Sequence, residues 1–290
     1  MSTTTDLPAA PARPAKPGYW SDGIPQPVAV AMLVGGIIAA WWAAITIGGI
    51  SQIILPSPAQ VAGQIWIVLA NVFTGDYLLE HVLVTAQEVL LGFTFATIVG
   101  ITVGAWIGLT KFGQRAAMPL FVVLEATPKI AFAPLFVAWF GFGMTSKIVM
   151  ATFVSLFPII VSTAAGLGAA EELEQRLFRS MRASPWQVFW KLKIYRAMPF
   201  IFSGLKIASV SAVTGAVAAE LLGGGTGVGE QIRVAATRLA IDRVFGLIVL
   251  LSVFGLGLFS IVTLIERRVV FWQGASRRTR RAVPAQASQS

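Results

Sequence analysis

The sequence predicts an all-α integral membrane protein with six membrane-spanning helices. Of its 290 residues, 56% are apolar and only 12% are charged, whereas about 25% of the residues in soluble domains are charged. The mean hydropathy of +0.77 indicates that apolar side chains face lipid as well as one another. These values exclude an ordinary soluble domain.

The composition also excludes most metal and redox chemistry. The chain has no cysteine and one histidine, His81, so it cannot form a disulfide framework, a thiolate metal site or a histidine cluster. We therefore expect no catalytic residue, no metal and no cofactor in this chain. The net charge of +9 is interpreted as a signal of orientation, because cytoplasmic loops of membrane proteins collect Lys and Arg. No nucleic-acid partner is expected.

Six apolar runs are long enough to cross a membrane. They lie at about residues 28–50, 82–110, 117–141, 148–168, 199–220 and 244–265. The third run is interrupted by Pro119, Pro128 and Pro134. A further apolar piece at residues 61–73 is too short to cross, and we expect it to lie at the outer surface.

The distribution of basic residues predicts the orientation of these runs. One side of the membrane receives most of the basic residues: Lys111, Arg115, Arg176, Arg179, Arg182, Lys191, Lys193, Arg196, Arg267, Arg268, Arg277, Arg278, Arg280 and Arg281. The opposite side receives Lys147, Arg233, Arg238 and Arg243. Because basic loops remain in the cytoplasm, we expect both termini there, as a disordered tail at residues 1–27 and a basic tail at residues 271–290.

Small residues recur at every fourth position in two of the runs. In the second run they are Gly92, Ala96, Gly100, Gly104 and Gly108, and in the fifth they are Gly204, Ala208, Ala212 and Ala216. Helices in lipid associate through close van der Waals contact, which small residues permit. These stripes indicate packing within the chain or, along the fifth run, an interface with a second subunit.

The loop at residues 169–198 is expected to contain two short helices. Apolar residues repeat at four-residue spacing in its first part: Leu173, Leu177 and Met181. This spacing predicts an amphipathic helix over residues 170–182. Ser184 followed by Pro185 is typical of an N-cap and a first helical position, so a second helix should begin there. Such a pair could bind a partner protein or lie in the lipid headgroups.

The frame of this loop is Ala183-Ser184-x-Trp186-x-x-Phe189, followed by Ala197-Met198-Pro199-Phe200-Ile201-Phe202-Ser203-Gly204-Leu205-Lys206-Ile207-Ala208. It resembles the cytoplasmic loop of permease subunits of ATP-binding-cassette importers. Their signature is a Glu-Ala-Ala triplet, a glycine four positions after its last alanine, and Ile-x-Leu-Pro downstream. Alignment of the frame places Arg176 at the first position of the triplet and Arg182 at the glycine, so the consensus itself is eroded.

Further motifs look like the nitrate, taurine and alkanesulfonate branch of these permeases. They are Thr127-Pro128-Lys129-Ile130-Ala131-x-Ala133-Pro134-Leu135, Trp139-Phe140-Gly141-Phe142-Gly143, Ala218-Ala219-Glu220 and Gly225-Thr226-Gly227-Val228-Gly229. Together with the loop, these resemblances cover roughly residues 80 to 270.

The resemblance implies a MetI-like permease of a type I importer in the inner membrane of a bacterium, with residues 28–270 as its transmembrane domain. It implies a homodimer of two permease copies embedded in lipid, two ATPase subunits that bind ATP and magnesium, and an external protein that delivers a small anionic solute. The permease itself would not be an enzyme. The residues implied to contact the ATPase are Arg176, Arg179, Arg182, Ala183, Ser184, Trp186 and Phe189.

Lys129 is a charged residue near the middle of the third apolar run. A charge near the centre of the bilayer costs about 2.5–3.5 kcal/mol, so Lys129 needs a partner, which could be an anionic substrate, Glu125 or Glu88. We assign Lys129, Glu125, Thr127 and Glu220 to a candidate substrate pathway. The glycine-rich residues 223–229 lack the ending of a phosphate-binding loop and are expected to form an outer turn.

Two functions of other classes remain to be weighed against a permease. An ion-coupled secondary transporter would need acidic residues inside the membrane, but it would not need an exposed loop of two helices. A membrane enzyme would need Glu125, Lys129 and His81 to supply an acid, a base or a nucleophile, and no spacing supports this.

Overall fold

The computed structural model describes residues 25–75, 77–169 and 172–272. The described part of the chain folds into helices and contains no strand. Most of the two predicted tails, at residues 1–27 and 271–290, lies outside the described residues. The chain divides into two units, Met1–Gln52 and Ile53–Ser290.

The first unit contains helix α1, Gln26–Thr46. Pro25 precedes the helix and a second proline lies in its first turn, where a missing N–H group leaves no intrahelical bond unmade. Its described residues 27–46 have a mean hydropathy of 2.2, and the length is sufficient to span a membrane. This helix corresponds to the first predicted run.

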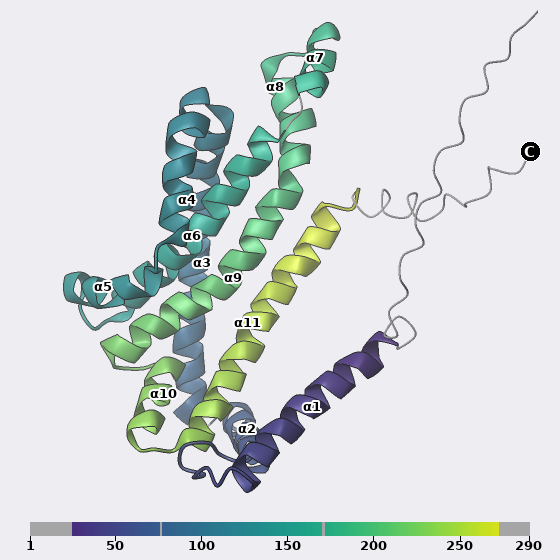
Figure 1. The fold of residues 1–290 in the computed structure, drawn as a ribbon. Coiled ribbons are helices and arrows are strands. Elements are labelled where there is room, and N and C mark those ends of the chain that lie inside the picture. The colour runs from purple at the N-terminus through teal and green to yellow at the C-terminus, as the bar shows by residue number, and fades with distance from the viewer. Residues whose placement is uncertain (1–24, 76, 170–171, 273–290) are drawn as a thin grey trace, which may run out of the picture. The chain divides into compact units, whose positions relative to one another are not determined.

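The second unit contains the other helices (Figure 1). They are α2 (Pro58–Phe73), α3 (Tyr77–Leu109), α4 (Met118–Ala126), α5 (Ala133–Phe140), α6 (Met144–Gly168), α7 (Glu172–Ser180), α8 (Pro185–Val188), α9 (Ile194–Gly223), α10 (Val228–Thr237) and α11 (Ile241–Val269). The helices α7 and α8 lie at one end of this unit, and α2 and α10 lie at the opposite end.

Candidate spanning helices lie at each of the six predicted runs, and their bounds differ from the predicted ones by several residues. Among the described residues, five helices are long and apolar enough to cross, and the pair Gly113–Ala126 and Lys129–Phe140, which is bent by 84°, makes a sixth if it is counted as one broken span. The fifth span differs most from the prediction, because helical backbone runs without interruption over Pro185–Gly223 rather than beginning at Pro199. A π-helical turn at Phe189–Lys193 joins α8 to α9, and membrane helices tolerate an internal proline.

Helix α6 packs against both α3 and α9 through the small residues. A Cβ atom built on Gly100 or Gly104 would lie under 3.0 Å from atoms of Ile159 or Thr163 of α6. On α9, Gly204 packs in the same way against Ser162, and the alanines of its stripe are fully buried within the single chain: Ala208, Ala212 and Ala216. Packing within the chain is therefore the correct interpretation of both stripes.

Helix α2 belongs to the packed body of the second unit. Ser57 forms a capping box with Gln60 at its start, and Pro58 lies in its first turn. Val68 of α2 is buried in one cluster with Leu247 of α11 and other residues. Residues 61–73, which are expected at the outer surface, therefore also contribute to the core.

Candidate functional site

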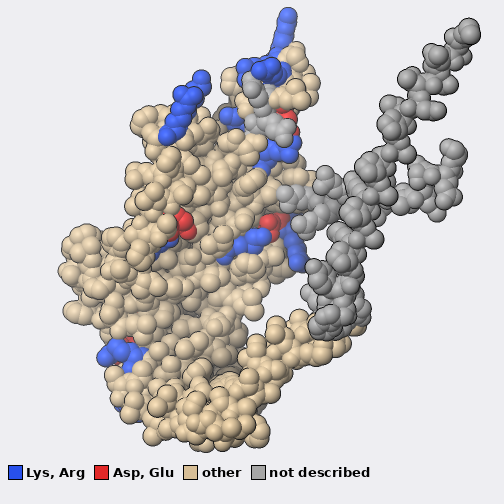
Figure 2. Space-filling model, viewed as in Figure 1, with Lys and Arg blue, Asp and Glu red and all other residues tan. Residues whose placement is uncertain are grey.

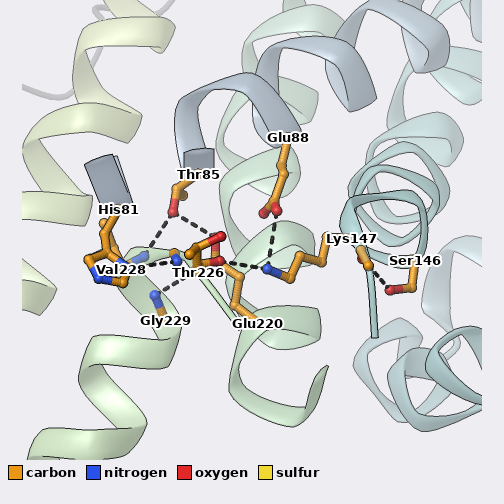
Figure 3. A network of polar contacts seen from close by, with 11 residues as sticks. His81, Thr85, Glu88, Ser146, Lys147, Glu220, Thr226, Val228 and Gly229 are labelled. Atoms are coloured by element: carbon orange, nitrogen blue, oxygen red, sulfur yellow. Dashed lines mark hydrogen bonds and ion pairs between the residues drawn. The ribbon is translucent and has the colours of Figure 1, made fainter. Parts of the chain in front are cut away.

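A buried polar network joins α3, α6 and α9 at the end of the second unit opposite α7 and α8 (Figure 3). Its charged members are Glu88 of α3, Lys147 of α6 and Glu220 of α9, whose exposed fractions are 0%, 3% and 0%. The Nζ atom of Lys147 lies 3.2 Å from Oε1 of Glu88 and donates a hydrogen bond of 2.6 Å to the carbonyl oxygen of Thr226. One lysine therefore connects α3, α6 and the loop that follows α9.

The glycine-rich loop after α9 encloses the carboxylate of Glu220. The Oγ1 atom of Thr85 donates to Oε1 of Glu220 at 2.6 Å, and the amide of Gly229 donates to Oε2 at 2.5 Å. Gly227 has φ +143°, and a Cβ atom there would lie 2.3 Å from Cδ of Glu220. The carboxylate thus requires glycine at position 227, both for its backbone conformation and for the space.

His81 and Thr85 complete the contacts of this loop with α3. The amide of Gly227 donates to Nδ1 of His81 at 2.9 Å, and the amide of Val228 donates to Oγ1 of Thr85 at 2.9 Å. Helix α10 begins directly afterwards, so the predicted outer turn is a short turn followed by a helix. At α10, two hydrogen bonds from Arg233 to Glu230 raise the pKa of the guanidinium group.

The network corrects two expectations about charged residues. The predicted runs leave Lys147 in the connection between the third and fourth spans, but α6 begins at Met144 and places Lys147 in its first turn, where it is buried. Glu88 was a candidate partner of Lys129 and instead pairs with Lys147. Sequence reasoning missed this pair because only the packing of α3 on α6 brings the two residues together.

Lys129 lies at the break between α4 and α5 and pairs with Glu125. Its Nζ atom donates to the carbonyl oxygen of Glu125 at 2.7 Å and lies 3.5 Å from Oε2 of the same residue. The break leaves carbonyl groups at the end of α4 without intrahelical donors, and a cation there also interacts favourably with the helix dipole. The lysine is 5.5 Å from the ring centroid of Phe157.

The structure brings three of the four candidate pathway residues together. Thr127 follows α4 and donates from Oγ1 to the carbonyl oxygen of Val123 at 3.1 Å, next to Glu125 and Lys129. Glu220, by contrast, belongs to the buried network, and none of its described contacts joins it to Lys129.

The loop containing α7 and α8 has the local structure that the sequence predicts. Ser184 accepts a hydrogen bond from the amide of Gln187 at 3.3 Å, and the side chain of Gln187 accepts one from the amide of Ser184 at 2.9 Å. This capping box confirms Ser184 as an N-cap. Arg196 forms an ion pair with Glu174 and so ties α7 to α9.

Apolar side chains of this loop are exposed: Leu173, Leu177, Met181, Trp186 and Trp190. Lys and Arg gather at the same end of the molecule (Figure 2). Arg182 lies between the two helices with φ +54°, a left-handed conformation that glycine adopts most easily. A glycine would adopt this conformation without strain, which explains why the permease signature has a glycine at the position that Arg182 occupies here.

An apolar groove of about 910 Å³ runs between α9 and α11. Thr214 and Ser252 are its only lining residues with polar side chains among those described. At the α7 end of these two helices, Nζ of Lys206 in α9 lies 2.8 Å from Oε2 of Glu266 in α11, which forms an ion pair between the two helices.

Comparisons with known proteins agree with this geometry. Residues 96–271 match the family described as the binding-protein-dependent transport system inner membrane component. The chain belongs to this family. The permease is therefore a transport subunit of an ATP-binding-cassette importer, not an enzyme, and its ATPase is a separate partner chain.

Three relatives show the range of the family around this permease. The riboflavin transport system permease protein RibX of Chloroflexus aurantiacus is 31% identical over 240 residues, which cover 82% of this chain and 88% of RibX. The taurine transport system permease protein TauC of Escherichia coli is 29% identical, with 82% and 87% covered. The nitrate import permease protein NrtB of Synechocystis is 30% identical, with 74% and 80% covered.

The family assignment decides between the function classes left by the sequence. The permease works with an ATPase and with a substrate-binding protein. This assignment takes the place of the two alternatives, an ion-coupled secondary transporter and a membrane enzyme. The three relatives are named for three different solutes, so membership of the family leaves the solute of this permease open.

Proposed function

We propose that two copies of the permease form one pathway, with both termini in the cytoplasm, and that the loop of α7 and α8 docks each copy onto an ATPase. The observation that carries this proposal is the exposed apolar surface of the loop, which is held in place by the Ser184 capping box and by the ion pair of Arg196 with Glu174. A rigid element with an exposed apolar surface is suited to bind a groove on a partner protein.

The charge distribution supports the proposed orientation. The end that carries α7 and α8 also carries most of the Lys and Arg side chains in view (Figure 2), as the cytoplasmic end of a membrane protein does. The contact residues proposed on this surface are Arg176, Arg179, Arg182, Ala183, Ser184, Trp186 and Phe189. The apolar groove between α9 and α11 is available on the membrane-facing part of the same chain for contact with the second copy.

Cysteine cross-linking tests the docking surface. The chain has no cysteine of its own, so Ala183→Cys and Ser184→Cys each introduce a unique thiol. We expect both variants to cross-link to the co-purified ATPase, whereas Thr237→Cys at the opposite end should not. The intact complex should contain two identical permease copies by native mass spectrometry.

Two results would contradict the docking proposal. Cross-links from the turn at residues 110–117, with none from positions 183 and 184, would move the contact to another loop. Labelling of positions 183 and 184 by a lipid-soluble reagent, with no cross-link to the ATPase, would favour a hairpin that lies in the headgroups.

We also propose that Lys129, Glu125 and Thr127 line the pathway of a small anionic solute. Lys129 retains 13% exposure and its partner Glu125 retains 36%, so both groups can be reached from outside the protein. Relatives named for taurine, aliphatic sulfonates and nitrate support an anion, and the bend of 84° is the kind of irregular backbone that lines a cavity at membrane depth. We leave Glu220 out of the proposed pathway because its side chain is fully buried.

Charge substitutions at position 129 test this role. Lys129→Ala and Lys129→Gln should both lower uptake of the anion and substrate-stimulated ATP hydrolysis while the complex still assembles, and Lys129→Arg should retain part of the activity. Thermal unfolding in the same preparations separates a structural role: if Lys129→Gln and Glu125→Gln each lose stability and the double variant regains it, the pair is structural. Normal uptake by a stable Lys129→Ala protein would contradict both roles.

A further inference from the structure

The turn between α7 and α8 holds Arg182 in a left-handed backbone conformation. The amide of Arg182 donates to the carbonyl oxygen of Arg179 at 3.0 Å, and the amide of Ala183 donates to that of Phe178 at 3.0 Å. These two bonds form a Schellman motif, which ends α7 and places Arg182 at the position of positive φ, here +54°. Because the Cβ atom of such a residue crowds the following carbonyl oxygen, an arginine at this position strains the free permease.

The same motif ends α10 and provides a comparison within the chain. The amide of Leu239 donates to the carbonyl oxygen of Ala236 at 3.0 Å, the amide of Ala240 donates to that of Ala235 at 3.0 Å, and φ of Leu239 is +58°. Among the described residues, Arg182 and Leu239 are the only ones other than glycine with positive φ. The two positions therefore carry the same kind of strain, one at each end of the second unit (Figure 1).

The side chain of Arg182 does not contribute to holding the turn. It is exposed, and within the described part of the chain it takes part in no hydrogen bond or ion pair. Glu174 of α7 is paired instead with Arg196 of α9. The turn is held by its backbone bonds and by the capping box of Ser184, which a glycine at position 182 would leave intact. The guanidinium group is therefore free to bind a partner protein.

The surroundings of Arg182 indicate the chemistry of that partner. Met181 directly before it and Trp186 four residues after it have exposed apolar side chains, and Arg179 is exposed as well. When this surface enters a groove of a partner protein, the guanidinium group of Arg182 leaves water and stays charged, because arginine does not lose its proton in proteins. A buried cation without a counter-charge strongly opposes binding. The groove therefore needs an anionic group opposite Arg182.

We propose that Arg182 forms an ion pair with a carboxylate group of the ATPase, in the groove that receives the turn between α7 and α8. This proposal rests on the docking of the loop proposed above and adds the chemistry of the contact. An aspartate or glutamate side chain matches the planar guanidinium group through two parallel hydrogen bonds. Their formation in the complex offsets the backbone strain of Arg182 in the free permease.

The affinity of the full-length permease in lipid nanodiscs for its co-purified ATPase tests the ion pair. Arg182→Gly removes both the charge and the strain. We expect it to lower the affinity by about tenfold or more, while the thermal midpoint of the free permease is equal to or above that of the wild type. Leu239→Gly is the matched control for strain, and its midpoint should behave in the same way with no change in affinity. Lys111→Gln removes one exposed positive charge from the turn after α3 and should leave the affinity within about twofold of the wild type.

A zero-length cross-link tests whether the partner group is a carboxylate. Carbodiimide joins a carboxylate to an amine when the two groups are in contact, and it does not join one to a guanidinium group. Arg182→Lys keeps the charge and supplies the amine, so we expect an amide bond between position 182 and an aspartate or glutamate of the ATPase, located by mass spectrometry of the peptides. The same variant should retain part of the affinity that Arg182→Gly loses, because lysine lacks the planar fork of arginine.

Four results would overturn the ion pair. They are wild-type affinity in Arg182→Gly, an equal loss of affinity in Lys111→Gln or Leu239→Gly, a complex of Arg182→Lys without a cross-link from position 182, and a lower thermal midpoint in Arg182→Gly. The last result would show that the arginine stabilises the permease itself.

The docking proposal can fail separately from the ion pair. If Ala183→Cys and Ser184→Cys cross-link to the ATPase while Arg182→Gly binds it normally, the loop docks and only the ion pair is wrong. If neither cysteine cross-links to the ATPase, both proposals are wrong.

Discussion

Gly104→Leu is expected to prevent the permease from folding. A Cβ atom at position 104 would lie 2.7 Å from Cβ of Thr163 and 2.8 Å from the carbonyl oxygen of Ile160. The oxygen belongs to the backbone of α6, so it cannot move without displacing that helix from α3. Adding a few methylene groups to a packed core lowers the free energy of unfolding by about 1–3 kcal/mol. A complete leucine side chain placed against backbone atoms should lower it by more.

The measurement is the yield of monodisperse protein after size-exclusion chromatography in detergent, together with its thermal midpoint. Gly257→Leu is the matched control, because Gly257 also lies in a spanning helix, α11, and nothing lies within 4 Å of a Cβ atom built there. The control should keep its yield, since replacing an exposed helical glycine improves helix propensity by up to about 1 kcal/mol. Equal losses in the two variants would show that the contact of α3 with α6 is not what requires glycine.

Gly227→Ala should disrupt the buried network. The new Cβ atom would lie 2.3 Å from Cδ and Oε1 of Glu220, and φ +143° is unfavourable for any side chain. Backbone strain of this kind costs about 1–3 kcal/mol. Displacing the Glu220 carboxylate from its donors adds to this, so we expect the free energy of unfolding to fall by about 3 kcal/mol or more.

Gly225→Ala separates backbone strain from the carboxylate contact. Gly225 has φ +89° and open space around its Cβ position, so its variant should lose only the strain of about 1–3 kcal/mol. Thermal unfolding of both variants in the same detergent makes the comparison. If Gly227→Ala were no less stable than Gly225→Ala, the close approach of Glu220 would not be the reason for glycine at position 227.

Features encoded by local pattern could be predicted from the sequence. Apolar runs located the five uninterrupted candidate spans and the bent pair of helices, because a spanning helix must cover the hydrocarbon core with its own side chains. The spacing of leucines and the Ser184-Pro185 pair located α7 and the start of α8, because capping depends on neighbours a few residues away. The prolines of the third run predicted an interruption at one or more of Pro119, Pro128 and Pro134, and the structure has its break at Pro128.

Features that depend on packing could not be predicted in the same way. The ion pair of Glu88 with Lys147 forms only when α3 lies against α6, and the enclosure of Glu220 depends on the path of the loop after α9. Helix α10 was missed because Val228 follows a glycine-rich stretch that resembles a plain turn. The sequence offered three partners for Lys129 without deciding between them, and the structure pairs it with Glu125, four residues earlier.

The glycine contacts between α3 and α6 also limit how the permease can change its conformation. Gly92 meets Ala151, Gly100 meets Ile159 and Gly108 meets Leu167, so successive glycines fit successive positions of α6 in one fixed register. Sliding either helix by a residue would force side chains against backbone along the whole length of the contact. We therefore expect the two helices to move as one rigid body. Hinges of the transport cycle are then expected where the backbone is already irregular, for example at the bend between α4 and α5, in the glycine turn after α9 or at the π-helical turn between α8 and α9.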